Sequence, residues 1–333
     1  MQVALIRNIF ETIPESVTHE LTSHGIVLDC RECMNGDEVA AFACDAEVIW
    51  DNAGSHVISA ECLHQLPRCR VILRTGSGTD NLPVKEATAL GIIVANTPEA
   101  IAETVAEHAM ALLLAAVRNL VQYDRNVRAG KWRQGASDPA TRLCGRTLGF
   151  VGFGRIARYV ARMLGGFRMT LLAFDPNIDA STIAEHGARK VELDELLSAS
   201  DFATIHTPLT NSTHHLIGEA QLKRMQPHAV LVNVARGPVV DEAALVRALT
   251  NGWIGGAAMD VLEIEPALPN NALFALPNVV LTPHIASYSD QFADQFWSHS
   301  VRTLIEIAHG NMPLWVANPD VTPRQVPNKI DSD

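Results

Sequence analysis

Three polar side chains follow predicted strands in the second half of the chain, and their types suit a proton transfer. Arg236 comes after the apolar run 231–235, Glu265 lies in the acidic segment 260–266, and His284 follows a short apolar run. Ligands bind outside the carboxyl ends of the strands in an open α/β sheet, so we expect these side chains to face one crevice. Each alone has an ordinary explanation: a surface cation, a solvated turn, a structural histidine.

Together, the three side chains can interconvert an alcohol and a carbonyl. A nicotinamide takes or gives the hydride in such a reaction, and the protein must handle the proton. Histidine suits that task because it titrates near neutrality, and a glutamate beside it favours the charged ring and fixes its orientation. An arginine can clamp a carboxylate or polarise a carbonyl. The set therefore predicts a dehydrogenase site.

A glycine-rich turn earlier in the chain predicts a dinucleotide site. The segment Gly152-Phe153-Gly154-Arg155-Ile156-Ala157 follows an apolar run and matches the G-x-G-x-x-G/A pattern of a strand turning tightly into a helix. Gly152 allows the turn, Gly154 lets a pyrophosphate approach the backbone, and the small Ala157 lets the helix pack on the strand. The N–H groups at the helix start attract phosphates.

Asp175 indicates which dinucleotide binds. It ends the apolar run 169–174, roughly 20 residues beyond the glycines, as the fingerprint requires. A carboxylate there accepts hydrogen bonds from both ribose hydroxyls of NAD and repels the extra phosphate of NADP. Glycines alone would fit a turn in any α/β domain, but with the aspartate in place the segment predicts NAD.

Composition bounds the class of protein. The 333 residues suffice for about two domains, and 47% hydrophobic with 19% charged residues is an ordinary globular balance. The net charge of −11 argues against a surface for nucleic acid or anionic membranes. The N-terminus reads as a strand without signal-peptide features, and six cysteines show no disulfide framework, so we expect a cytoplasmic protein with reduced thiols. Cys30 and Cys33 form a CxxC without a second pair nearby, and we expect no metal site.

Short apolar runs alternate with helical segments along the whole chain, which predicts parallel sheets covered on both faces. The expected strands are 3–6, 26–28, 48–50, 71–73, 92–94, 169–174, 201–205, 229–234, 254–259 and 279–281. The expected helices are 14–23, 83–90, 101–128, 219–225, 241–250 and 289–310, with a loop over 131–145 and a loose polar tail from about 316.

The loop 74–81 follows the fourth expected strand and has glycines on both sides of Ser77. Successive N–H groups in such a loop can point the same way and make a small anion nest. An ordinary turn between strand and helix explains the same residues equally well.

Four segments, in order along the chain, carry a family resemblance: 152–157, 233–242, 260–266 and 283–284. They resemble the signatures of the D-isomer-specific 2-hydroxyacid dehydrogenases, and the likeness covers nearly the whole chain. It implies an α/β fold of two doubly wound parallel-sheet domains. A central Rossmann NAD-binding domain, 101–286, would be inserted in a flavodoxin-like substrate domain made of 1–100 and 287–333.

The resemblance also implies roles for single residues. His284 would be the acid/base, Glu265 its partner and Arg236 the substrate clamp, while the N–H groups of Ser77 and Gly78 would hold the substrate carboxylate. The residues that would line NAD are Thr104, Gly152, Gly154, Arg155, Ile156, Asp175, Pro176, Thr207, Pro208, Thr213, Ala235, Asp260 and His284.

The chain departs from the family pattern beside the substrate. Ala286 stands where many members have glycine, and Ser77 stands where an apolar residue is common. The side-chain end of the substrate pocket is expected near residues 52–55 and the final helix. These departures leave the identity of the acid open.

We therefore expect an NAD-dependent dehydrogenase acting on a small 2-hydroxy or 2-keto acid. We expect a homodimer formed through residues 101–130, where a long helix carries apolar residues on more than one face. The alternative is an NAD(H)-sensing binding protein similar to the C-terminal-binding corepressors, whose branch the segment 285–289 resembles as much as it does D-lactate dehydrogenases.

Overall fold

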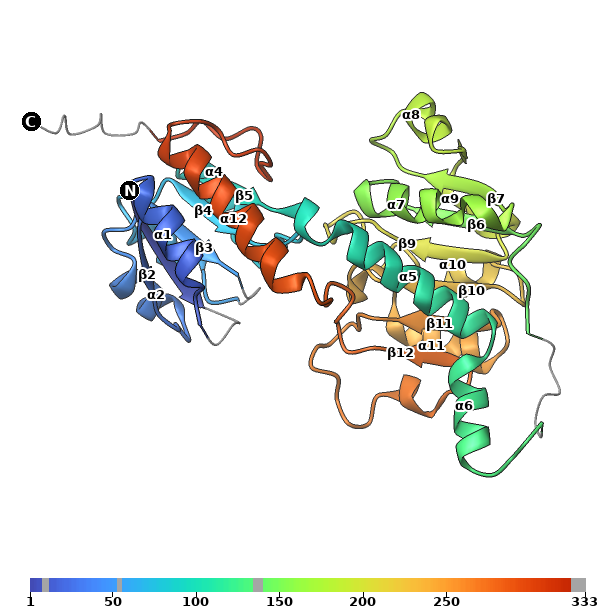
Figure 1. Ribbon diagram of the computed structural model, residues 1–333. Helices are drawn as coiled ribbons and strands as arrows, with labels where there is room; N and C mark the ends of the chain where they lie inside the picture. The colour runs from blue at the N-terminus through green and yellow to red at the C-terminus, as the bar shows by residue number, and fades with distance from the viewer. Residues whose placement is uncertain (8–11, 53–55, 134–139, 325–333) are drawn as a thin grey trace, which may run out of the picture. The chain divides into compact units, whose positions relative to one another are not determined.

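The computed structural model describes residues 1–7, 12–52, 56–133 and 140–324, and the chain divides into two compact units. Unit 1 comprises Met1–Ile101 with Ser289–Asp333, and unit 2 comprises Ala102–Tyr288. The N-terminal part of the chain and the long C-terminal helix α12 thus belong to the same unit (Figure 1).

Unit 1 is built on a five-stranded parallel sheet in the order β2-β1-β3-β4-β5, which is the flavodoxin-like arrangement. Its strands are β1 (Gln2–Arg7), β2 (Val27–Cys30), β3 (Val48–Asp51), β4 (Val71–Arg74) and β5 (Ile93–Asn96). Its helices are α1 (Glu15–Ser23), α2 (Gly36–Phe42), α3 (Ala60–His64), α4 (Val84–Ala89), the 3-10 turn η1 (Pro98–Ala100) and α12 (Phe292–Ala308).

Alternating side chains cover both faces of this sheet. Ile49 and its neighbours pack under α2, α3 and α4, whereas Val48 and Trp50 face α1 and α12. Side chains alternate between faces along a strand, so a run that is apolar at every position must be buried on both sides. Trp50 also meets Trp297 of α12 edge to face at 5.4 Å, which fixes the C-terminal helix to the N-terminal sheet.

The expectation of a loose tail is wrong for residues 316–324, which include a buried residue bonded to the sheet of unit 1. Asn318 is 5% exposed and lies against the edge strand β5, where its Oδ1 accepts from the Val94 N–H at 2.8 Å and its Nδ2 donates to the Ile92 oxygen at 2.9 Å. An edge strand leaves backbone groups unpaired, and this side-chain amide satisfies them. No local pattern in the tail reveals such a distant partner.

Unit 2 is built on a seven-stranded parallel sheet in the order β12-β11-β10-β9-β6-β7-β8. Its strands are β6 (Thr147–Val151), β7 (Thr170–Phe174), β8 (Ala188–Lys190), β9 (Phe202–Ile205), β10 (Val230–Asn233), β11 (Gly256–Met259) and β12 (Val279–Leu281). The order β8-β7-β6-β9-β10-β11 is that of a Rossmann fold, which confirms the expected fold class. Each expected strand is present; the short edge strand β8 was not expected.

The helices of unit 2 cover both faces of its sheet. They are α5 (Ala102–Val117), α6 (Leu120–Arg128), α7 (Arg155–Met163), α8 (Ala180–Glu185), α9 (Leu193–Ala199), α10 (Glu219–Arg224) and α11 (Glu242–Thr250), with 3-10 turns η2 (Leu164–Phe167), η3 (Gly237–Val239) and η4 (Ala272–Ala275). Helices α9, α10 and α11 bury their apolar residues in one core with β9 to β11. Helix α5 packs against α7 and against strands β10 and β11.

The prediction of a single helix over 101–128 is wrong, because the segment forms two helices, α5 and α6. Helix α5 ends at Val117, and Asn119, just before α6, adopts φ +53°. The axes of α5 and α6 are bent by 61° relative to each other. Asparagine tolerates this left-handed conformation better than most residues, so the stop carries no glycine or proline signal. Among the described residues, no single helix is long and apolar enough to cross a membrane; only this bent pair, taken together, reaches that length and composition.

Candidate active site

The carboxyl ends of the unit 2 strands carry most of the predicted site residues. Gly152 follows β6, Asp175 and Pro176 follow β7, Thr207 and Pro208 follow β9, Ala235 and Arg236 follow β10, Asp260 follows β11 and His284 comes after β12. Because all seven strands are parallel, these ends lie along one edge of the sheet. Strands β7 and β8 are added on one side of β6, and strands β9 to β12 on the other. The switch point between β6 and β9 is where an open α/β sheet forms its crevice.

The glycine turn after β6 has the shape that a pyrophosphate requires. Gly152 has φ +87°, and a Cβ atom on it would lie 2.8 Å from the Thr207 nitrogen, so the loops after β6 and β9 can touch only at a glycine. Gly154 precedes α7, and a Cβ there would meet nothing within 4 Å. The backbone is therefore open to a ligand at the helix start, beside Arg155 and Ile156.

Asp175 is held in place by the same turn. Its Oδ2 accepts from the Phe153 N–H at 2.8 Å, and its Oδ1 accepts from the Asn177 N–H at 2.8 Å. A carboxylate has about four acceptor positions, so both oxygens can also accept from ribose hydroxyls. The residues present therefore fit the adenosine half of a dinucleotide.

The loop after β9 is folded by one threonine. Thr213 Oγ1 donates to the Pro208 oxygen at 2.6 Å and accepts from the Thr210 N–H at 2.7 Å. These two bonds close a turn that holds Thr207 and Pro208 next to the glycine turn. Thr104, the remaining residue expected near the cofactor, lies in the first turn of α5.

Asp260 organises the end of the sheet around His284. The carboxylate is 1% exposed and accepts from Thr282 Oγ1 at 2.6 Å and from the N–H groups of Ile285 and Ala286 at 3.0 and 2.9 Å. Burial raises the pKa of Asp260, but the hydrogen bonds from His108, Thr282 and these two N–H groups outweigh it and hold the pKa below its usual value.

The backbone of His284 is strained, with φ +54°, a value uncommon for a residue other than glycine. Its N–H donates to the backbone carbonyl oxygen of Asp260 at 2.7 Å, and the Asp260 carboxylate accepts from the N–H groups of the two following residues. The surroundings therefore determine where the imidazole lies. Strain of this kind gathers at functional sites.

His284 and Glu265 form a close pair. His284 Nδ1 lies 2.6 Å from Glu265 Oε2, and Glu265 Oε1 accepts from the Leu262 N–H at 2.9 Å. Half of the His284 side chain is exposed. Burial raises the pKa of Glu265, but the hydrogen bonds from His284 and Leu262 and the positive charges of His284 and Arg236 lower it further than burial raises it.

Arg236 reaches this pair through a close backbone contact. Asn233 holds the turn after β10, donating from Nδ2 to the Arg236 oxygen at 2.9 Å and accepting from the Ala235 N–H at 3.0 Å. A Cβ on Gly237 would lie 1.8 Å from the Leu262 oxygen, so only glycine lets this turn meet the segment that carries Glu265. The structure thus brings Arg236, Glu265 and His284 together.

Sequence reasoning missed two sets of supporting residues. His108 Nε2 lies 3.0 Å from Thr282 Oγ1 and 3.5 Å from Asp260 Oδ1, which links α5 to the strand ends. His108 lies one helical turn beyond Thr104, and that spacing was the available signal. Glu242 and Glu263 join the segments of Arg236 and Glu265, and no spacing rule indicates such a pairing.

The loop after β4 in unit 1 carries the remaining predicted residues, Ser77 and Gly78. Gly76, with φ +104°, accepts from the Thr97 N–H at 3.0 Å and donates to Thr97 Oγ1 at 2.9 Å. Asn96 Nδ2 donates to the Ser77 oxygen at 2.8 Å. The loop shape is therefore fixed by β5. Of the segment 52–55 expected beside the substrate, residues 53–55 lie outside the described residues.

A Rossmann unit whose strand ends carry these polar residues is typical of an NAD-dependent dehydrogenase. The family model of the D-isomer specific 2-hydroxyacid dehydrogenase NAD binding domain matches residues 110–286. A glyoxylate reductase of Korarchaeum cryptofilum is 45% identical over 268 residues, which span 79% of this chain and 80% of that protein.

Two solved structures show the same fold over nearly the full length. A glyoxylate reductase from Paecilomyes thermophila is 29% identical with a TM-score of 0.87, covering 95% of this chain and 98% of that one. An NADPH-dependent glyoxylate/hydroxypyruvate reductase from Sinorhizobium meliloti, in complex with NADP and malonate, is 30% identical with a TM-score of 0.83, covering 97% and 98%.

The chain belongs to the D-isomer-specific 2-hydroxyacid dehydrogenase family, and residues 110–286 form its NAD-binding domain. It is an NAD-dependent oxidoreductase of 2-hydroxy acids. These comparisons do not favour the alternative of an NAD(H)-sensing binding protein similar to the corepressors.

Proposed function

We propose that this protein reduces small 2-keto acids, with glyoxylate the preferred substrate, and that His284 supplies the proton. The observation that carries the proposal is the 2.6 Å contact between His284 Nδ1 and Glu265 Oε2. A second support is the glyoxylate reductase that is 45% identical to this chain. Unit 1 would be the substrate domain, and the N–H groups of Ser77 and Gly78 would hold the substrate carboxylate.

NADH supplies the hydride when it is bound. The glycine turn would hold its pyrophosphate, Asp175 would accept from its ribose hydroxyls, and Asp260 would meet its carboxamide. Thr104, Pro176, Thr207, Pro208, Thr213 and Ala235 would line the rest of the site. We propose a preference for NADH over NADPH because the Asp175 charge repels a 2′-phosphate.

The geometry of the histidine pair supports this role of His284 in the proton transfer. Glu265 accepts from Nδ1–H, which leaves Nε2 as the nitrogen that meets the substrate oxygen. In reduction, the carbonyl carbon gains the hydride, the carbonyl oxygen takes the Nε2 proton, and His284 ends neutral. Glu265 stabilises the imidazolium before the transfer, and the Arg236 guanidinium polarises the carbonyl and clamps the carboxylate.

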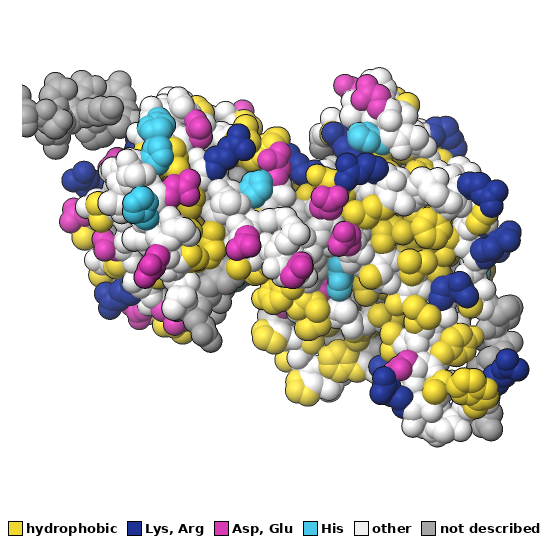
Figure 2. Space-filling model, in the orientation of Figure 1, with side chains coloured by type: hydrophobic (Ala, Val, Ile, Leu, Met, Phe, Trp, Pro, Cys, Tyr) yellow, Lys and Arg dark blue, Asp and Glu magenta, His cyan; other side chains and the backbone are white. Residues whose placement is uncertain are grey.

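We further propose a homodimer through α5 and α6. None of the α6 residues is buried within the chain, and Leu120 and Val127 are 54% and 49% exposed. Hydrophobic side chains gather on the face of unit 2 that carries these helices (Figure 2). A helix without a fully buried residue in its own chain is stabilised when its exposed apolar residues meet a second copy.

The decisive experiment measures NADH oxidation with glyoxylate, hydroxypyruvate, pyruvate and 2-oxobutyrate. We expect the highest kcat/KM with glyoxylate. His284→Ala should lower kcat by ~10²–10⁴ and leave NADH affinity almost unchanged, as the loss of a general acid does. Tight NADH binding without turnover of any of these acids would contradict the proposal and favour a binding protein. A His284→Ala variant with a lower melting temperature but normal kcat would remove His284 from the chemistry.

A further inference from the structure

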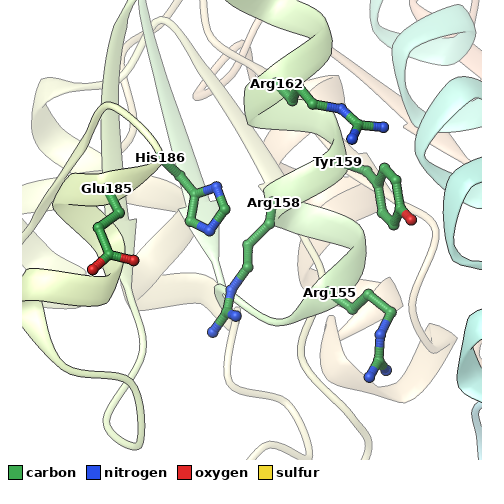
Figure 3. Close-up of a pocket in the computed structure, with 6 residues that line it drawn as sticks. All are labelled: Arg155, Arg158, Tyr159, Arg162, Glu185 and His186. Atoms are coloured by element: carbon green, nitrogen blue, oxygen red, sulfur yellow. The ribbon is translucent and has the colours of Figure 1, made fainter.

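A cationic pocket lies beside the glycine turn of unit 2. It has a volume of about 570 Å³ and is lined by Arg155, Arg158, Tyr159, Arg162, Glu185 and His186 (Figure 3). The three arginines are spaced three and four residues apart on α7, so they share one face of the helix. Glu185 and His186 form the opposite wall, at the end of α8. The pocket suits an anion, because its lining carries three guanidinium groups and one carboxylate.

Phe153 connects this pocket to the carboxylate that recognises ribose. Its N–H donates to Asp175 Oδ2 at 2.8 Å, and its oxygen accepts from Arg158 Nε at 3.2 Å. The Phe153 ring is buried, with its centroid 6.0 Å from that of His186 in an edge-to-face contact. Asp175, Arg158 and His186 are therefore all held around one fixed residue.

We propose that Arg158 and His186 form a subsite for a phosphate monoester on the 2′-oxygen of the adenosine ribose, and that only Asp175 keeps this subsite closed. This inference rests on the proposed function, in which the Asp175 carboxylate meets the ribose hydroxyls. A phosphate monoester carries a charge of about −1.5 to −2. Asp175 repels that charge, whereas a planar guanidinium binds it with two parallel hydrogen bonds. The cations that NADPH requires are thus already present in a chain that excludes it.

Arg162 provides the matched control. It lines the same pocket one helical turn beyond Arg158, but it pairs with Glu103 at 2.9 Å and stacks on the Tyr159 ring at 4.7 Å. Its side chain is 64% exposed. An arginine acting only through the general charge of the pocket would affect binding as much from position 162 as from position 158.

The first experiment compares the ratio of kcat/KM for NADPH to kcat/KM for NADH across variants. Asp175→Asn removes the charge and keeps an oxygen for the Phe153 N–H, so the ratio should rise about tenfold or more. Adding Arg158→Gln should remove most of this gain, and adding His186→Asn should remove part of it. Adding Arg162→Gln should retain the gain. The proposal is overturned if Arg158→Gln leaves the gain intact or if Arg162→Gln removes it equally.

The second experiment needs no turnover and uses the Asp175→Asn variant, in which the subsite should be open. Calorimetry measures the Kd of 2′,5′-ADP and of 5′-AMP for Asp175→Asn and for the double variant Asp175→Asn with Arg158→Gln. We expect the Kd ratio, 2′,5′-ADP over 5′-AMP, to rise about five- to tenfold in the double variant, which corresponds to the loss of one charge-assisted contact. An unchanged ratio overturns the proposal.

The calorimetry also separates this inference from the proposed function, since adenosine phosphates bind whether or not a keto acid is reduced. Inorganic phosphate alone distinguishes the two sources of the same chemistry. If its binding depends on Arg158 while that of 2′,5′-ADP does not, the pocket serves a free anion and the ribose subsite is refuted.

Discussion

Glu242 and Glu263 exchange two hydrogen bonds, each from the backbone N–H of one residue to the carboxylate of the other. The Glu242 N–H donates to Glu263 Oε2 at 3.1 Å, and the Glu263 N–H donates to Glu242 Oε2 at 3.0 Å. Asn271 Nδ2 adds a bond to Glu242 Oε1 at 2.7 Å. The start of α11 is thereby tied to the segment that carries Glu265, next to the contact between Gly237 and Leu262.

We expect Glu242→Gln to lower kcat for keto-acid reduction about tenfold, since a lost hydrogen bond to a charged group costs about 1.5–3 kcal/mol and the segment of Glu265 then loosens. The KM for NADH should stay within twofold of its original value, because Glu242 lies away from the glycine turn. Steady-state kinetics with both substrates varied check this result.

The control for Glu242 is Glu219→Gln on α10. Glu219 also bonds two partners, Lys223 at 2.6 Å and Arg247 at 3.0 Å, but none of them is in the site. It should lose no activity. Equal losses in both variants would make Glu242 a purely structural residue.

Glu265→Gln should shift the pH dependence of the two reaction directions in the same way. Glu265 Oε2 lies 2.6 Å from His284 Nδ1, and the charge of His284 contributes to lowering the pKa of Glu265. In the proposed mechanism, reduction needs protonated His284 and oxidation needs it neutral. Without the carboxylate, reduction should lose activity at lower pH, and oxidation should remain active to lower pH. Rate profiles from pH 5 to 10 that do not move would exclude Glu265 from the proton step.

Arg236→Lys should weaken the binding of the keto acid more than the binding of the cofactor. Lysine keeps the charge but loses the planar fork, so one of two hydrogen bonds to the carboxylate or carbonyl is lost. We expect kcat/KM for glyoxylate to fall about 10- to 100-fold, which corresponds to one charge-assisted bond. A raised KM for NADH with an unchanged KM for glyoxylate would place Arg236 in the cofactor site instead.

Light scattering should give twice the 36.1 kDa mass of the chain at micromolar concentration. The variant Leu120→Glu with Val127→Glu should give the monomer mass, since it places charges on the exposed apolar side chains of α6. Met34→Glu, an equally drastic change at a residue 71% exposed in unit 1, should remain dimeric. A monomer mass for the unaltered chain refutes the dimer.

His206 should make the apoprotein less stable in acid. The residue as a whole is only partly buried, but Nδ1 is enclosed without a hydrogen-bond partner in the described structure, and burial lowers the pKa of His206 to about 3. A depressed folded-state pKa gives stability that is present above the unfolded value of about 6.5 and is lost as pH falls toward 3.

Between pH 7 and pH 5, this histidine should account for about 2 kcal/mol of lost unfolding free energy. Urea titrations of the unaltered chain and of His206→Gln at both pH values check it, because glutamine does not titrate. The exposed His19→Gln serves as the control and should follow the unaltered chain. If His206→Gln loses as much stability in acid as the unaltered chain, His206 is not the titrating group.

The errors of sequence reasoning fall where a distant partner overrides local pattern. The apolar periodicity of residues 101–128 continues through the bend at Asn119, because α6 keeps helical spacing although none of its residues is fully buried. The polar, proline-containing tail looks unstructured until Asn318 is seen to pair the edge of β5. Both outcomes depend on surfaces that form only after the sheets have assembled.

By itself, the sequence determined the cofactor turn, the strands and the fold class. Gly152 needs a positive φ and Gly154 needs open space, both of which are local demands, and buried parallel strands must be apolar along their whole length. Motif order then indicated which strand end carries Arg236, Glu265 and His284. Only the tertiary structure decided that the Arg236 turn meets the Glu265 segment, through Gly237 against Leu262 and through Glu242 against Glu263. These contacts join residues more than twenty positions apart, and no periodicity or propensity within one segment can specify the distance to another.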